Sequence, residues 1–149
     1  MIRLDKYISK LARYSRSELR KLLKKWEVFV DNNKINDGWI MVQDSMIIRI
    51  FETHIEVKEN VTIILHKPSG YVCSNINEWG HLSWKHLIKD CPYHAMLEIA
   101  GRLDFDTEWL VVATSDGQLA HRLISPKWKL PKTYYIKSKN PLRILSDGS

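Results

Sequence analysis

The stretch Gly101-Arg102-Leu103-Asp104-Phe105-Asp106-Thr107-Glu108 places several carboxylates beside an arginine. Apolar runs flank it, Leu97–Ala100 before and Leu110–Thr114 after, and each run predicts a short strand. The acidic stretch is therefore expected to lie where a strand passes into a loop. A positioned carboxylate can act as a nucleophile or a base, and a nearby arginine can keep it ionised. The residues alone favour a plainer interpretation, a surface loop with an internal salt bridge.

The sequence around this loop predicts a sheet with interspersed helices. Val61–Leu65 is typical of a buried strand, and a turn over 66–70 separates it from a second strand at Tyr71–Cys73. The turn Ser115-Asp116-Gly117 precedes a helix over 118–124 that Pro126 ends. We also expect a short helix within 79–89, burial of Leu119, Leu123 and Ile124 on their helix, and a strand over 132–137.

The first part of the chain predicts two short helices followed by β-strands. Apolar residues recur at helical spacing from Leu4 to Ala12, and Ser15 with Glu18 has the pattern of a capping box. The second helix has an apolar stripe on one face and a cationic opposite face. The stripe consists of Leu19, Leu22, Leu23 and Trp26, and the cationic face of Arg16, Arg20, Lys21, Lys24 and Lys25. Strands are expected at 28–30 and 46–51, with a turn at 31–34.

Charge is distributed unevenly along the 149 residues, whose net charge is +6. Residues 1–34 carry a net charge of +6, residues 35–117 carry −6, and residues 118–149 carry +6. Basic ends around an acidic middle suggest a polyanionic partner, although lysines that only keep the surface solvated explain the charge equally well. No apolar run approaches the ~18–20 residues that span a membrane. Two cysteines are too few for a disulfide framework, so a reducing cytoplasm is the expected location.

The first part resembles a known RNA-binding unit. Arg3-Leu4-Asp5-Lys6-Tyr7-Ile8, the segment Ser15-Arg16-Ser17 that opens a basic helix, and Val28–Val30 resemble the small domain named after ribosomal protein S-four. The resemblance implies contacts with RNA phosphates from Arg3, Ser15, Arg16, Arg20 and Lys24. Asp31-Asn32-Asn33 replaces the family's valine-asparagine-glycine ending.

The second part resembles the RsuA-type pseudouridine synthases. The resemblance is carried by motifs in a fixed order: Lys67-Pro68-Ser69-Gly70-Tyr71-Val72-Cys73-Ser74, Gly101-Arg102-Leu103-Asp104, Asp106-Thr107-Glu108, Asp116-Gly117, Leu119-Ala120-His121-Arg122-Leu123, Ser125-Pro126 and Lys132-Thr133-Tyr134-Tyr135-Ile136. It implies an isomerase that converts a uridine in ribosomal RNA, that of the small subunit, to pseudouridine. A chain of this family is expected to be a cytoplasmic monomer without metal or cofactor.

The same resemblance assigns roles in the active site. Asp104 is implied to be the catalytic aspartate, Arg102 to pair with it and orient it, and Tyr134 to contact the uracil. Asp104 would either attack the anomeric carbon or remove the C2′ proton, and the sequence does not choose between these routes. The target base must leave its stack to reach the carboxylate, so an aromatic platform is useful.

The expected fold is α+β. An S-four-type domain of two helices and a small sheet covers 1–58, and the N-terminal part of a mostly antiparallel, mixed-sheet pseudouridine synthase domain covers 59–149. Trp109 stands where the family has glycine, and no counterpart of the family's later strands follows residue 137. The alternative function is therefore a non-catalytic RNA-binding remnant. A metal-binding module, suggested by the spacing of Cys91 and His94, is a weaker third reading because no second close pair completes the ligand set.

Overall fold

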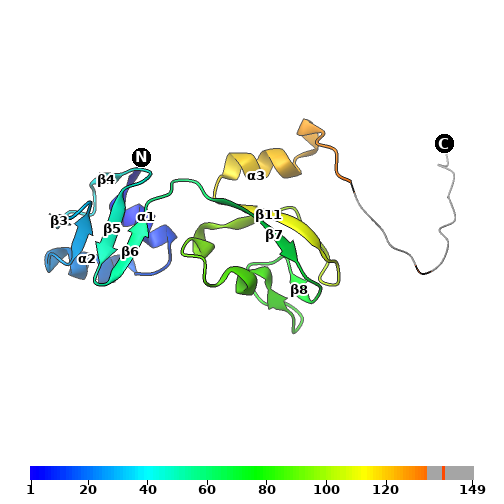
Figure 1. Ribbon diagram of the computed structural model, residues 1–149, viewed down its shortest axis with the longest axis horizontal. Coiled ribbons are helices and arrows are strands. Elements are labelled where there is room, and N and C mark those ends of the chain that lie inside the picture. The colour runs from blue at the N-terminus through cyan, green and yellow to red at the C-terminus, as the bar shows by residue number, and fades with distance from the viewer. Residues whose placement is uncertain (134–138, 140–149) are drawn as a thin grey trace.

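The computed structural model describes residues 1–133 and 139 of the chain, and it has an α+β fold. Two groups of elements follow each other along the chain (Figure 1). The N-terminal lobe comprises β1 (Ile2–Arg3), α1 (Leu4–Lys10), α2 (Arg16–Lys24), β2 (Val28–Val30), β3 (Asn33–Ile35), β4 (Met41–Val42), β5 (Ile47–Ile50) and β6 (Thr53–Glu56). The C-terminal lobe comprises β7 (Thr62–Lys67), β8 (Tyr71–Val72), β9 (Leu82–Ser83), η1 (Trp84–Ile88), η2 (His94–Met96), β10 (Glu98–Ala100), β11 (Trp109–Thr114), α3 (Gly117–Ile124) and η3 (Pro126–Trp128).

The N-terminal lobe packs its two helices against one face of a four-stranded antiparallel sheet with the strand order β3-β2-β5-β6. Its core consists of buried side chains from the helices, the sheet and the strand ends, namely Leu4, Tyr7, Ile8, Leu11, Leu19, Leu23, Val28, Val30, Val42, Ile48, Ile50, Ile55 and Val57. Alternating burial along β2 and β5 shows that only one face of this sheet meets the core. The other face is open.

The predicted start of α2 is confirmed. The Ser15 hydroxyl accepts a hydrogen bond from the Glu18 N–H, and the Glu18 carboxylate accepts one from the Ser15 N–H, which completes the capping box. The predicted apolar stripe is wrong at Trp26. Trp26 lies beyond the end of α2 at a positive φ of 57° and is 47% exposed, because the helix ends at Lys24 and its turn directs the next residues away from the core.

The C-terminal lobe is built on a three-stranded antiparallel sheet with the order β10-β11-β7. Trp84, Leu97 and Ala113 are fully buried on its inner face, with Val61, Ile63, Leu65, Ile88, Cys91 and Ile99 packed around them. In Figure 1, α3 lies on one side of this sheet and the segment that contains β8 lies on the other. The strands predicted at 61–65, 71–73, 97–100 and 110–114, and the helix over 118–124, are all present.

Two details of the predicted second part are wrong. Val61–Leu65 is not a fully buried strand, because Ile64 is 69% exposed on the outer face of β7, where α3 does not reach. Ile124 is 47% exposed at the end of α3, while Leu119 and Leu123 are half-buried. The short helix expected within 79–89 is present as the 3₁₀ helix η1 over Trp84–Ile88, and residues 79–83 before it form a turn and β9. Most of the strand predicted over 132–137 falls outside the described residues.

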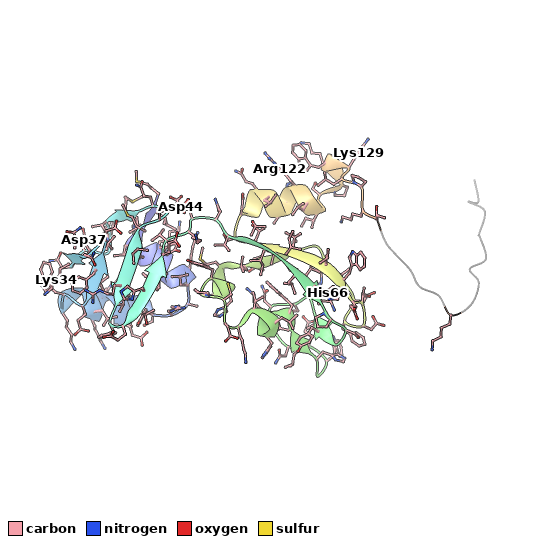
Figure 2. The ribbon with its side chains drawn as sticks, viewed as in Figure 1. Lys34, Asp37, Asp44, His66, Arg122 and Lys129 are labelled. Atoms are coloured by element: carbon pink, nitrogen blue, oxygen red, sulfur yellow. The ribbon has the colours of Figure 1, made fainter. Side chains whose placement is uncertain are left out.

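The lobes are joined by hydrogen bonds around the connection that leads from β6 to β7. The Tyr7 hydroxyl accepts from the Lys58 N–H at 2.9 Å, and the Tyr93 hydroxyl donates to the Glu56 carbonyl at 2.8 Å. The carboxylate of Asp44, labelled in Figure 2 near this connection, accepts a hydrogen bond from the Glu59 N–H. Tyr93 and Met96 also pack against the N-terminal core, so the second lobe contributes to the packing of the first. Among residues 1–133, no helix is long and apolar enough to cross a membrane.

Candidate active site

The acidic stretch lies in the connection between β10 and β11. Because Trp109 pairs with Lys67 in the antiparallel ladder, this connection lies beside the turn that follows β7. Gly101 begins it with a φ of +93°, a backbone conformation that favours glycine. The sheet thus brings residues 101–108 next to the segment that begins at Lys67, although more than thirty residues of chain separate them.

The buried side chain of Lys67 holds the loop in place through hydrogen bonds. Its side chain is completely buried, and its ammonium group donates to the carbonyls of Pro68 at 3.1 Å, Tyr71 at 2.9 Å and Phe105 at 3.3 Å. The Phe105 carbonyl also accepts from the Gly70 N–H at 2.7 Å. A buried ammonium group is tolerated only when its donors are satisfied, so this contact ties the residue after Asp104 to the turn after β7.

Two further contacts hold the loop. The Leu103 N–H donates at 3.3 Å to the sulfur of Cys73, the residue that follows β8. The Phe105 ring stacks on the His81 ring with centroids 4.3 Å apart and planes 19° apart. The loop is therefore held on both sides of Asp104.

Asp104 itself is exposed, and its backbone carbonyl accepts from the Thr107 N–H at 3.1 Å. Arg102 is also exposed, and the expected pairing of its guanidinium with Asp104 is absent from the ion pairs of residues 1–133. One residue separates Arg102 from Asp104 in the chain, and neither side chain is buried enough to require a partner. The Glu108 carboxylate lies 3.6 Å from Nε2 of His66, a contact that is an ion pair when His66 is protonated, and His66 is labelled on β7 in Figure 2.

A groove of about 420 Å³ runs beside the loop. Its lining includes Arg102 and Leu103 of the loop, the apolar side chains of Trp109, Leu110 and Leu123, and residues 130–133. Trp109 is 44% exposed there, so the residue at the family's glycine position occupies part of the groove wall. Tyr134 follows the lining residue Thr133 and lies outside the described residues.

The residues predicted to bind RNA fall into two groups. Arg16, Arg20 and Lys24 are exposed on α2. Arg3 and Ser15 have other contacts: Arg3 makes two hydrogen bonds to the Asp5 carboxylate, at 3.0 and 2.5 Å, and lies over the Trp39 ring, while Ser15 caps α2. The Arg3 guanidinium lowers the pKa of the Asp5 carboxyl by hydrogen bonding.

Sequence reasoning assigned no role to Lys67 and Phe105 in holding the site. A lysine at the end of an apolar strand is a signal for a buried, satisfied charge, but its acceptors come from three separate positions of the chain. Cys91 and His94, the suggested metal ligands, are instead in contact with each other: the Nδ1 atom of the His94 ring lies 2.9 Å from the Cys91 carbonyl oxygen, within hydrogen-bond distance. Within residues 1–133, no group of three His, Cys, Asp or Glu side chains converges.

Residues 61–146 match the family described as RNA pseudouridylate synthase. The chain belongs to this family. The match includes β7, the loop with Asp104 and the groove, so the site described above lies within the family's own segment.

Individual relatives agree with this assignment. The chain is 36% identical to ribosomal small subunit pseudouridine synthase A of Vibrio parahaemolyticus over 135 residues, and 35% identical to an uncharacterized RNA pseudouridine synthase of Aquifex aeolicus over 136 residues. Each alignment covers 91% of this chain and 57% of the relative. A solved structure titled "Crystal structure of pseudouridylate synthase" is 32% identical, with a TM-score of 0.41, and the match covers 85% of this chain and 54% of that one. The chain thus spans less than two thirds of the length of these pseudouridine synthases.

Proposed function

We propose that this chain isomerises uridine to pseudouridine in RNA, with small-subunit ribosomal RNA as the substrate class. The observation that carries the proposal is an exposed Asp104 on a loop that Lys67, Gly70 and Cys73 hold beside an open groove, all within the family's segment. The names of relatives such as the synthase of Vibrio parahaemolyticus support the choice of ribosomal RNA.

In this proposal Asp104 is the catalytic carboxylate. As a nucleophile it forms a bond to C1′ of the ribose while the bond from C1′ to N1 of uracil breaks. The uracil turns and its C5 bonds to C1′ as the carboxylate leaves. C5 then loses its proton to solvent, and N1 takes up a proton. As a base, Asp104 instead removes the C2′ proton, and a double bond forms between C1′ and C2′ as the bond from C1′ to N1 breaks. C5 then bonds to C1′ while C2′ takes its proton back, and the proton on C5 is again exchanged for one on N1. Both routes need a carboxylate that an extruded base can reach, which agrees with the exposure of Asp104.

The groove and the basic helix supply the binding part of the proposal. Apolar walls at Leu110 and Leu123 suit the faces of a flipped base, and Arg102 at the rim suits a phosphate. We propose that residues 1–58 act as the S-four-type RNA-binding domain, with Arg16, Arg20 and Lys24 on phosphates. Tyr134 as the uracil contact, the monomeric state and the cytoplasmic location are parts of the same proposal.

The decisive experiment incubates the purified chain with transcribed ribosomal RNA and maps pseudouridine by chemical labelling. Asp104→Asn is expected to abolish product, at least about a thousandfold, because the neutral amide can neither attack nor accept the proton. Asp106→Asn, two residues further along the same exposed loop, is the matched control and is expected to retain product. Equal product from the Asp104→Asn variant and the wild-type chain would exclude Asp104 as the catalytic group.

A second candidate is an RNA-binding protein without catalysis. It is favoured by the exposed cations of α2, whose helix packs on its own core apart from the loop of Asp104. This candidate predicts salt-sensitive RNA binding that Arg16→Ala and Arg20→Ala weaken and Asp104→Asn leaves unchanged, with no pseudouridine formed. Detection of product would eliminate it.

A further inference from the structure

The open face of the four-stranded sheet in the N-terminal lobe carries one row of cationic and aromatic side chains. The ladder registers pair Lys34 with Phe29, Phe29 with Arg49 and Arg49 with His54. These four residues therefore cross β3, β2, β5 and β6 in a straight line. All four project from the face opposite the core, because their neighbours Val28, Val30, Ile48 and Ile50 are buried. We call them the sheet-face row.

Two cations of the row converge on one ring. The Arg49 guanidinium carbon lies 3.8 Å from the centroid of the Phe29 ring, and the Lys34 ammonium lies 5.8 Å from the same centroid. Both distances are within the range of attractive cation–π contacts. The contact places the Arg49 guanidinium over the Phe29 ring, and the Arg49 side chain remains partly exposed.

The charges of the row are not neutralised by neighbouring carboxylates. None of the four ion pairs found among residues 1–133 includes Lys34 or Arg49. The carboxylate that shares this face, Glu56 beside Ile47, pairs with Lys58 at 3.1 Å. The row thus presents two cations with unused hydrogen-bond donors, and Figure 2 shows Lys34 at the end of the lobe away from the C-terminal lobe.

The row is separate from the basic face of α2. Leu19 and Leu23 of α2 belong to the same core as Val28 and Ile48, so α2 and the open face lie on opposite sides of that core. One strand of RNA bound along α2 therefore does not also cover the row.

We propose that the sheet-face row is a second RNA-binding surface, which takes a single-stranded segment. A base stacks on the open face of the Arg49 guanidinium, and Lys34 and the edge of Arg49 bind the adjoining phosphates. A planar guanidinium suits both tasks, and stacking platforms with flanking cations are how single strands are bound without sequence preference. The proposal rests on RNA being the partner of this protein, as proposed above, and adds a site that α2 and Asp104 do not include.

The test measures binding of the full chain to a fluorescently labelled oligouridine by anisotropy over a series of salt concentrations. The combined variant Lys34→Gln, Arg49→Gln is expected to bind about tenfold more weakly, and the slope of log K against log salt is expected to fall by about 1.4 because two phosphate contacts are lost from a single strand. Arg49→Lys, which retains charge but not the planar stack, is expected to weaken binding with an unchanged slope. Lys89→Gln, an exposed lysine of the other lobe, is the control for general charge.

The comparison with α2 separates this proposal from the proposed function. If Arg20→Gln weakens oligouridine binding while the Lys34 and Arg49 variant binds like the wild-type chain, the row is not an RNA surface and the proposed function stands. If the wild-type chain binds no RNA, the proposed function fails, and the proposal for the sheet-face row fails with it. Full affinity in Arg49→Lys would overturn the stacked base, and equal loss of binding to a fully paired duplex would overturn the preference for single strands. Unchanged urea midpoints confirm that each variant is folded.

Discussion

Lys67 shows how one residue links the sheet to the site. Burial removes water from its ammonium group, which is unfavourable unless each N–H finds an acceptor. Carbonyls of Pro68, Tyr71 and Phe105 supply those acceptors, and no carboxylate of residues 1–133 takes part. The geometry makes the loop of Asp104 depend on a side chain that substrate does not need to touch.

Replacement of Lys67 by methionine is expected to lower the free energy of unfolding by about 2 kcal/mol, because buried carbonyls lose a charged donor. Urea denaturation monitored by tryptophan fluorescence measures this change. Product formation is expected to fall as well, since the Phe105 carbonyl keeps only its bond from Gly70. Lys89→Met on the exposed surface is the control and is expected to change stability by less than about 0.5 kcal/mol. A stability of Lys67→Met equal to that of the control would show that the anchor does not hold the loop.

At the scale of the element, the N-terminus of α2 is stabilised by a capping box that the sequence predicts. The Ser15 hydroxyl and the Glu18 carboxylate satisfy N–H groups that the first turn of the helix would leave unpaired. Hydrogen bonds that the Ser15 hydroxyl and the Ser15 N–H donate to the Glu18 carboxylate lower the pKa of that carboxyl. The cap therefore sets where the basic face of α2 begins.

Substitution of Ser15 by alanine is expected to cost about 1 kcal/mol of stability, the usual effect of losing an N-cap side chain. It is also expected to weaken RNA binding slightly through fraying of the turn that carries Arg16. Ser17→Ala, two residues later, removes a hydroxyl 3.1 Å from that of Ser15 but keeps both bonds between Ser15 and Glu18, and it serves as the control. Circular dichroism during thermal unfolding measures both variants, and an Ser15→Ala midpoint equal to that of the control would contradict the role of the cap.

At the scale of the whole molecule, tyrosines secure the junction between the lobes. Burial raises the pKa of the Tyr7 and Tyr93 hydroxyls, and both groups hold backbone atoms of the connecting segment. A raised pKa in the folded chain means that their contribution is complete below the unfolded tyrosine pKa of about 10 and is lost as the pH rises through the folded pKa.

The chain is therefore expected to lose stability above a pH of about 10, and Tyr7→Phe is expected to remove part of that loss. At neutral pH the same variant is expected to be less stable by about 1 kcal/mol, because the Lys58 N–H loses its acceptor. Urea midpoints of both chains across the alkaline range measure the difference. Tyr14→Phe, whose hydroxyl forms no hydrogen bond within residues 1–133, is the control; parallel pH profiles for Tyr7→Phe and the wild-type chain would refute the assignment.

The local patterns of the sequence determined much of the secondary structure. Helical spacing and a capping box placed α1 and α2, alternation and apolar runs placed β2, β5, β7, β10 and β11, and Asp116 before Gly117 placed α3. These features depend on neighbours within a few residues, so they can be read from the chain directly. The ordered motifs around Asp104 also pointed to the family to which residues 61–146 belong.

Only the tertiary structure decided which faces are covered and which side chains meet. It left Ile64 and Trp26 exposed, formed no ion pair between Arg102 and Asp104 within residues 1–133, paired Arg3 with Asp5, and bonded the Lys67 ammonium group to the Phe105 carbonyl. It also aligned Lys34, Phe29 and Arg49 from three strands. The physical reason is that these contacts join residues distant in the chain, through sheet register and burial, whereas sequence patterns record only what each segment prefers by itself.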